Sequence, residues 1–384
     1  MTTPAPYDLA PLGPLLAVGA LLALAPLVWV WLRSPEPTAA ARLQALTWVA
    51  LFLTFDLVLF GAFTRLTDSG LGCPDWPGCY GHASPLGATG HIDAAQQTTP
   101  TGPVTHSKAW IEMTHRYLAT GVGALIVVLA VWNGIAARRG TAGAAPRLAV
   151  LTLVWVCLQG AFGALTLTMK LYPAIVTLHL LGGIGLLVLL ACQTRPETPR
   201  TVVLSPSLRA AVWLLAAVGV VQIALGGWVS TNYAVLACSD FPTCQGTWWP
   251  SMDFEQGFRL RRELGAGTDG EYLPFAALTA IHMTHRLGAV VLLGILAWVA
   301  WRLAASAQTE VRRWAWPLAG VGLWQVLTGL GNVLLGWPLA AAVGHTGGAA
   351  ALAVILTLLL RRSLPERARG PATRPAGVSA RPAS

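Results

Sequence analysis

The stretch "IEMTHRYLATGVGALIVVLAVW" at residues 111–132 places a carboxylate, a histidine and an arginine at the head of a long apolar run. From Tyr117 to Trp132 the run contains no charged residue. About 20 apolar residues are enough to cross the hydrocarbon core of a bilayer as an α-helix. The stretch therefore predicts a transmembrane helix whose first turns carry polar side chains.

Similar runs recur along the whole chain. Of its 384 residues 55% are hydrophobic and only 11% are charged, and the mean hydropathy of +0.60 is unlike that of a soluble domain. We therefore expect an all-α polytopic membrane protein. Its predicted membrane helices are nine, at 11–32, 43–64, 109–136, 147–168, 172–193, 208–229, 274–301, 314–335 and 338–360.

The distribution of basic residues predicts the orientation in the membrane. A net charge of +9 would suit a nucleic-acid-binding protein, but 17 of the 25 Lys and Arg residues lie in alternate connections and in the C-terminal tail. The positive-inside rule makes that side the cytoplasm, and we expect no nucleic acid partner. The N-terminus and the long loops 65–108 and 230–273 are then outside, and the C-terminus is cytoplasmic. The first apolar run has no basic n-region or cleavage site, so we expect it to remain as a helix.

The opening phrase belongs to an internal repeat. "IEMTHR" at 111–116 returns as "IHMTHR" at 281–286, "DLVLFG" at 56–61 aligns with "QIALGG" at 222–227, and "CPDWPGC" at 73–79 aligns with "CSDFPTC" at 238–244. Gln159 and Gln325 each precede a histidine by 20 residues. Each unit contains four predicted helices, an even number, so both enter the membrane in the same direction. This predicts two tandem four-helix bundles related by a pseudo-two-fold axis along the membrane normal.

The repeat gives a predicted division of the chain. Residues 1–42 form an extra N-terminal transmembrane helix and its linker, 43–194 the first bundle, 195–207 a cytoplasmic linker and 208–361 the second bundle. Residues 362–384, rich in Pro, Ala and Arg, are expected to be a disordered cytoplasmic tail.

Four histidines lie within predicted membrane helices, where ionisable side chains are costly and often functional. They are His115 and His179 in the first unit, and His285 and His345 in the second. Three lie six or seven residues below the outer start of their helices, and His285 is predicted about one turn deeper. Two histidines facing each other across a bundle can hold a haem iron from both sides.

Other interpretations of the histidines stay open. A membrane histidine can be a hydrogen-bonded packing residue. Zinc or copper would need three or four ligands at one depth, which neither unit gathers, and without C-x-x-C-H we expect no covalently attached haem. The glycines near these positions allow either close helix packing or room for a macrocycle; they are Gly121, Gly123, Gly182, Gly183, Gly288, Gly347 and Gly348.

Two cysteine pairs lie in the outward loops, on the oxidising side of the membrane. Cys73 with Cys79, and Cys238 with Cys244, are expected to form one disulfide in each loop. Redox-active thiols or a metal site are the alternatives. Cys157 and Cys192 lie within helices and are interpreted as small core residues.

Several motifs together closely resemble the haem A synthase family. They are "GAFTRLTDSGLGCPDWPGCYG" at 61–81, "IEMTHR", "IVTLHLLGG" at 175–183, "IHMTHR" and "GHTGGAA" at 344–350, and the resemblance covers residues 43–360. The helix at 11–32 and the long segment 82–108 depart from the shorter members. The resemblance implies a bacterial plasma-membrane enzyme that oxidises a methyl group of haem O to the formyl group of haem A, the cofactor of terminal oxidases.

The resemblance also implies residue roles. The substrate haem would lie between His115 and His179, and a cofactor haem b between His285 and His345. Glu112, one turn from His115, would accept a proton or stabilise positive charge on the oxidised carbon, whereas the second unit has His282 there. Pairing of Glu112 with Lys108 or Arg116 is the alternative.

Haem propionates need cations near the outer surface, and the candidates are Arg65, Lys108, Arg116 and Arg286. Expected partners are membrane lipid, a farnesyltransferase that supplies haem O, the terminal oxidase under assembly and an unidentified electron donor. The alternative functions are a diheme b-type membrane cytochrome that passes electrons, and a haem carrier for oxidase assembly.

Overall fold

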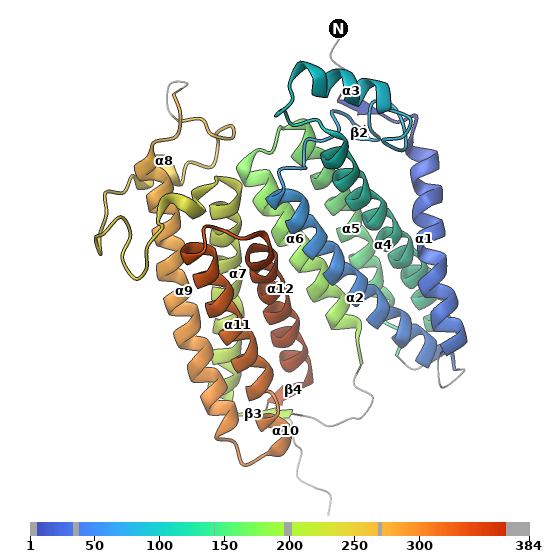
Figure 1. The fold of residues 1–384 in the computed structure, drawn as a ribbon. Helices are drawn as coiled ribbons and strands as arrows, with labels where there is room; N and C mark the ends of the chain where they lie inside the picture. The colour runs from blue at the N-terminus through green and yellow to red at the C-terminus, as the bar shows by residue number, and fades with distance from the viewer. Residues whose placement is uncertain (1–5, 34–37, 142, 196–201, 268–270, 366–384) are drawn as a thin grey trace, which may run out of the picture.

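The computed structural model describes residues 6–33, 38–141, 143–195, 202–267 and 271–365. Within these ranges nine helical spans are long and apolar enough to cross a membrane, which confirms the all-α polytopic prediction (Figure 1). Residues 196–201 of the predicted linker 195–207 and residues 366–384 of the predicted tail 362–384 lie outside the described residues. The spans are α1 Leu12–Arg33, α2 Ala39–Leu66, α4 His106–Arg138, α5 Pro146–Thr168, α6 Pro173–Gln193, α7 Pro206–Thr231, α9 Phe275–Ala304, short α10 Thr309–Arg312 with α11 Ala315–Leu334, and α12 Leu339–Arg362.

Capping residues set where the helices begin. The side chains of Thr38, Thr105 and Ser205 each accept a backbone N–H in the first turn of α2, α4 and α7. Because Thr105 is the cap, α4 begins three residues earlier than predicted. His115 therefore follows the first residue of α4 by nine positions, and His285 follows that of α9 by ten. The predicted difference in depth between these two histidines is wrong.

The long helices form two groups (Figure 1). Helices α2, α4, α5 and α6 contact one another in a ring, and α7, α9, α11 and α12 form a second ring. The groups meet where α12 packs on α2 and α6, and where α6 packs on α7. Helix α1 lies outside the rings, against α4 and α2. The pseudo-two-fold relation between the groups remains a prediction.

The burial pattern sets the register between the two halves. Five buried residues of α2 have buried counterparts in α7 that lie 165 residues later in the sequence. The residues of α2 are Leu43, Thr47, Ala50, Thr54 and Thr64, and their counterparts are Leu208, Val212, Leu215, Gly219 and Val229. The alignment of "DLVLFG" with "QIALGG" uses 166 and is one residue out of step. Asp56 is therefore equivalent to Val221, whereas Gln222 is equivalent to Leu57. One residue along a helix turns a side chain by about 100°, so this correction changes which way Asp56 faces.

Both long loops lie at the same end of the molecule as the start of α1 (Figure 1). β1 Tyr7–Asp8 pairs in parallel with β2 Trp76–Pro77, within the loop that also contains α3 Thr89–Thr98. The second loop contains a 3₁₀ turn, Ala234–Ala237, and α8 Phe254–Gly257. At the opposite end β3 Val202–Leu204 pairs with β4 Ser363–Pro365. The relative sidedness of loops and N-terminus is as predicted.

The cysteines divide as predicted, with one exception. Cys73 bonds to Cys79 and Cys238 to Cys244, which confirms both disulfides. Cys192 is half-buried, but Cys157 is exposed, so its assignment to the core is wrong. The buried stripe of α5 runs through Ala149, Thr152, Ala164 and Leu167, and Cys157 lies off that stripe.

Candidate functional site

The second bundle brings two predicted ligands face to face. The rings of His285 on α9 and His345 on α12 have centroids 6.4 Å apart and planes 79° from parallel. A metal bound by a nitrogen of each ring at about 2 Å needs ring centroids roughly 6 Å apart. The pair therefore fits an iron held from both sides. Within the described ranges no group of three or more His, Cys, Asp or Glu side chains is placed to hold a metal ion.

Neighbouring side chains hold both of these imidazoles by Nδ1. The Thr328 hydroxyl lies 3.0 Å from His345 Nδ1 and donates its own proton to the Trp324 carbonyl at 2.7 Å, so it accepts the Nδ1 proton. The Gln222 amide N–H group donates to His285 Nδ1 and to the His285 carbonyl, each at 3.0 Å, so His285 accepts at Nδ1 where His345 donates. Such contacts orient metal-binding histidines. In His345 this arrangement leaves Nε2 without a proton, the state that binds a metal.

The first bundle holds its histidines less firmly. The ring of His115 on α4 stacks on Phe60, with centroids 6.3 Å apart, and lies close enough to His179 on α6 for an electrostatic interaction. In the described part of the chain neither ring has a hydrogen-bond partner, and His179 Nδ1 is buried without one. The two pairs thus share their helix positions but differ in their support.

Each histidine ring lies against a glycine of a neighbouring helix. A Cβ atom added to Gly61 on α2 would lie 3.0 Å from the His115 ring, and one added to Gly226 on α7 would lie 3.0 Å from the His285 ring. A Cβ atom added to Gly329 on α11 would lie 3.3 Å from His345, and one added to Gly163 on α5 would lie 3.7 Å from His179. Bare backbone at these places leaves room for an imidazole and a flat group beside it. Sequence reasoning missed these glycines, although the repeat relates Gly61 to Gly226 and Gly163 to Gly329.

The glycines singled out from the sequence serve mainly in close packing. A Cβ at Gly182 would overlap the Gln159 amide, one at Gly288 would overlap Gln222, and one at Gly348 would overlap Trp324 and Gln325. The Gln325 amide donates to the His345 carbonyl at 3.0 Å, which explains why this glutamine precedes the histidine at a fixed distance.

Two disulfide loops, residues 73–82 and 238–247, have the same internal structure. Each contains two consecutive positive-φ residues, Tyr80–Gly81 and Gln245–Gly246, as a type I′ turn requires. The Asp75 carboxylate accepts both N–H groups of the first turn, and Asp240 accepts both of the second. Donation by the Thr243 hydroxyl, and then by these N–H groups, lowers the pKa of Asp240.

Arg116 and Arg286 fasten these disulfide loops to the bundles. Arg116 donates to the carbonyl oxygens of Asp75, Pro77 and Gly78. Arg286 donates to those of Cys238, Asp240 and Thr243. The two arginines occupy equivalent places and bind loop carbonyls in the same way in both bundles.

Glu112 is a buried member of the same arrangement. Its Oε1 pairs with Arg116 Nη2 at 2.5 Å, and its Oε2 accepts the Cys73 N–H at 2.9 Å. In the second bundle the equivalent His282 accepts a longer bond from Arg286 Nε, at 3.4 Å. The expected alternative, pairing with Arg116, is therefore present, and it puts a carboxylate one turn from His115 in the first bundle alone.

The other two propionate candidates have different surroundings. Arg65 donates to Asp68, to the Tyr233 hydroxyl and to the Ser230 carbonyl, and Tyr233 donates to Asp68 at 2.5 Å. These bonds join α2 of the first bundle to the end of α7. Lys108 Nζ donates to the Gly102 carbonyl at 3.4 Å. Propionate binding by any of the four cations stays a prediction.

Known proteins resemble the chain over most of its length. Residues 44–357 match the family model described as COX15-CtaA, cytochrome oxidase assembly protein. A "Heme A synthase" of Shewanella oneidensis is 39% identical over 325 residues, covering 82% of this chain and 94% of the relative. Proteins of the same name from Bradyrhizobium sp. and Halalkalibacterium halodurans are 28% and 25% identical, over 89% and 75% of this chain and 96% and 86% of their own lengths. The matches span both bundles.

Proposed function

The chain belongs to the COX15-CtaA family of cytochrome oxidase assembly proteins, and from this premise we propose that it is a haem A synthase. It is an oxidoreductase of the membrane that converts haem O into haem A for terminal oxidases. Its first bundle binds the substrate between His115 and His179, and its second bundle binds a haem b between His285 and His345. The N-terminus lies outside and the C-terminus lies in the cytoplasm of a bacterium.

One observation supports this division above the others: the second bundle fixes the histidines by Nδ1, and the first does not. A resident cofactor benefits from ligands held in a fixed orientation. A substrate must enter, react and leave, and iron held by two rigid ligands has no position for oxygen. Histidines without hydrogen bonds in the first bundle would let a haem bound between them exchange more readily.

The reaction sets what the residues must supply. Methyl oxidation to an aldehyde through a gem-diol consumes two O₂, four electrons and four protons and releases three waters. Haem iron, when bound, supplies the oxygen and redox chemistry, and the protein supplies orientation and electrostatics. Glu112, on the His115 face of α4, takes up a proton or stabilises positive charge at the reacting carbon, while Arg116 and the Cys73 N–H hold its carboxylate in place.

The test of Glu112 must separate catalysis from loop anchoring. Glu112→Gln keeps an oxygen to accept the Cys73 N–H but removes the charge. We expect it to retain bound haem and both disulfides while haem A formation, measured by mass analysis after incubation with haem O, reductant and oxygen, falls about 100-fold, an effect of several kcal/mol on the barrier. His282→Gln, the matched change in the second bundle, should leave the rate within about twofold. A normal rate in Glu112→Gln removes the catalytic assignment.

The same incubation separates this function from the two alternatives. A diheme cytochrome or a haem carrier would return haem O unchanged. Supply of haem O by a farnesyltransferase and delivery of haem A to a terminal oxidase are the partnerships that this function requires.

A further inference from the structure

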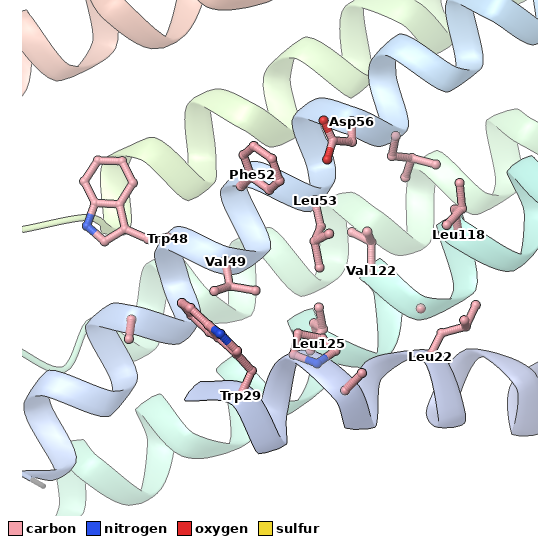
Figure 2. A pocket seen from close by; sticks show the side chains of 15 residues that line it. Leu22, Trp29, Trp48, Val49, Phe52, Leu53, Asp56, Leu118, Val122 and Leu125 are labelled. Atoms are coloured by element: carbon pink, nitrogen blue, oxygen red, sulfur yellow. The ribbon is translucent and has the colours of Figure 1, made fainter. Parts of the chain in front are cut away.

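A groove with one carboxylate lies between α1, α2 and α4 (Figure 2). It has a volume of about 850 Å³, and Asp56 is the one ionisable side chain among the 15 described residues that line it. Trp29 and Phe52 on its walls are 55% and 64% exposed, so the groove opens toward the surrounding lipid. The rest of the lining is apolar.

Asp56 is placed where a carboxylate is costly. It lies ten residues before the outer end of α2, which is about 15 Å along the axis and near the middle of a hydrocarbon core of about 30 Å. Within the described residues it has no hydrogen-bond or ion-pair partner. An ionisable side chain at this depth indicates function. The equivalent residue of the second half is Val221, an exposed apolar side chain.

Helix α1 supplies the third wall, which the second half lacks. It packs closely on α4, where a Cβ at Gly19 would overlap Thr120 and one at Gly121 would touch Leu22. Pro26, inside α1, has no N–H, so the Leu22 carbonyl loses its helical donor. Leu22 and Pro26 both line the groove. Among the described lining residues Asp56 supplies a carboxylate acceptor, and none supplies a cation.

These features select the occupant. The Asp56 carboxylate calls for a polar head with a hydroxyl donor, and Phe52, one turn from Asp56 on α2, offers a flat surface to a ring. The apolar remainder fits a hydrocarbon chain. Phospholipid head groups lie at the interface, far above this depth. An isoprenoid quinol has a flat ring, two hydroxyl groups and a chain that keeps it within the bilayer.

We propose that the α1–α2–α4 groove binds an isoprenoid quinol that supplies the reducing equivalents, an inference that rests on the proposed function. The Asp56 carboxylate accepts a hydrogen bond from a quinol hydroxyl and takes its proton as the electrons pass to the haem of the first bundle. Two quinols become two quinones and release four electrons and four protons, which matches the demand of one methyl-to-formyl conversion. The groove and the substrate site share two helices. Leu118 lines the groove about one turn after His115 on α4, and Leu57 lines it about one turn before Gly61 on α2.

The test measures haem reduction rather than product. The full chain with bound haem, in lipid nanodiscs without oxygen, is mixed with decylubiquinol, and the reduced-haem absorption is followed by stopped flow. We expect Asp56→Asn to slow this reduction about tenfold or more, with haem content and reduction by dithionite unchanged. Val221→Asn, the matched amide at the equivalent place on α7, should reduce at the wild-type rate.

The proposal is wrong if Asp56→Asn is reduced by decylubiquinol at the wild-type rate, or if decylubiquinol cannot reduce the wild-type protein. It is also wrong if Asp56→Asn loses affinity for haem O while its reduction by the quinol is intact. That result would assign the groove to the isoprenoid tail of the substrate. Haem A formation by the wild type with a chemical reductant tests the proposed function separately. If haem A forms that way while the quinol fails to reduce the haem, only the quinol site is wrong.

Discussion

The two bundles have the same helices, disulfide loops and histidine positions, and they differ in how a few side chains are supported. The second bundle fixes its imidazoles through Thr328 and Gln222. The first leaves His115 and His179 without hydrogen bonds among the described residues, and adds Glu112 next to them and Asp56 in the groove under α1. Under the proposed function, the second copy of a duplicated scaffold binds the cofactor and the first carries the reaction, without a change of fold.

Removing one histidine from each bundle should break the symmetry most strongly. His285→Ala should remove haem b and its Soret absorption, because one remaining ligand cannot hold the iron from both sides. His115→Ala should keep haem b but lower haem A formation by about 100-fold or more. Pyridine haemochrome spectra and product analysis measure the two effects. If both variants lose the same pigment and the same activity, the division of labour between the bundles is wrong.

Removing the hydrogen bond at one imidazole of the second bundle should weaken its binding of haem. Thr328→Val removes the acceptor at His345 Nδ1 and keeps the side-chain shape. We expect affinity for haem b to fall about 10- to 100-fold, as for other groups that orient metal ligands. Haem titration of the apoprotein measures it. The control is Thr346→Val, because Thr346 lies on α12 and bonds only within its own helix. Equal affinities in the two variants would refute the role of Thr328.

Crowding the histidines should affect the two bundles unequally. An added methyl at Gly226 meets His285, which Gln222 holds in place, whereas one at Gly61 meets His115, which is free to move. We expect Gly226→Ala to weaken haem b binding about tenfold, and Gly61→Ala to change haem O affinity by about threefold at most. Gly123→Ala and Gly294→Ala, where a Cβ meets nothing within 4 Å, are the matched controls. A larger loss at Gly61 would show that the first bundle is the more rigid one.

The smallest effect is expected at the contact between the bundles. Tyr233→Phe removes the hydroxyl that bonds to Asp68 and Arg65, and a partly exposed hydrogen bond contributes about 1 kcal/mol. The melting temperature should fall by a few degrees at most, with both haem spectra unchanged. Tyr272→Phe, whose side chain is 93% exposed, should have no effect. A spectral change in either haem would show that the contact between the bundles also shapes a haem site.

Much of the site followed from features that are local along the chain. Hydropathy predicted the nine spans, the repeat paired the histidines, and the position of the cysteines in the outward loops predicted both disulfides. The glycines against the histidine rings were absent from the candidates, as were Thr328 and Gln222. Arg116 and Arg286, which remain propionate candidates, also hold the disulfide loops, a role that the sequence did not predict. In each of these cases the missing knowledge was which residue of another helix stands opposite.

What the sequence by itself determined was therefore the membrane topology, the duplication and the set of chemically capable residues, because run length, spacing and residue type are properties of neighbouring positions. Only the tertiary structure decided which side chains meet. A helix presents a different face every residue, and a shift of one in the register turns Asp56 from a counterpart of buried Gln222 into a counterpart of exposed Val221. The direction in which a side chain points depends on how the helices pack. It decides whether the side chain contacts a histidine, as Gln222 does, or faces a groove in the bilayer, as Asp56 does.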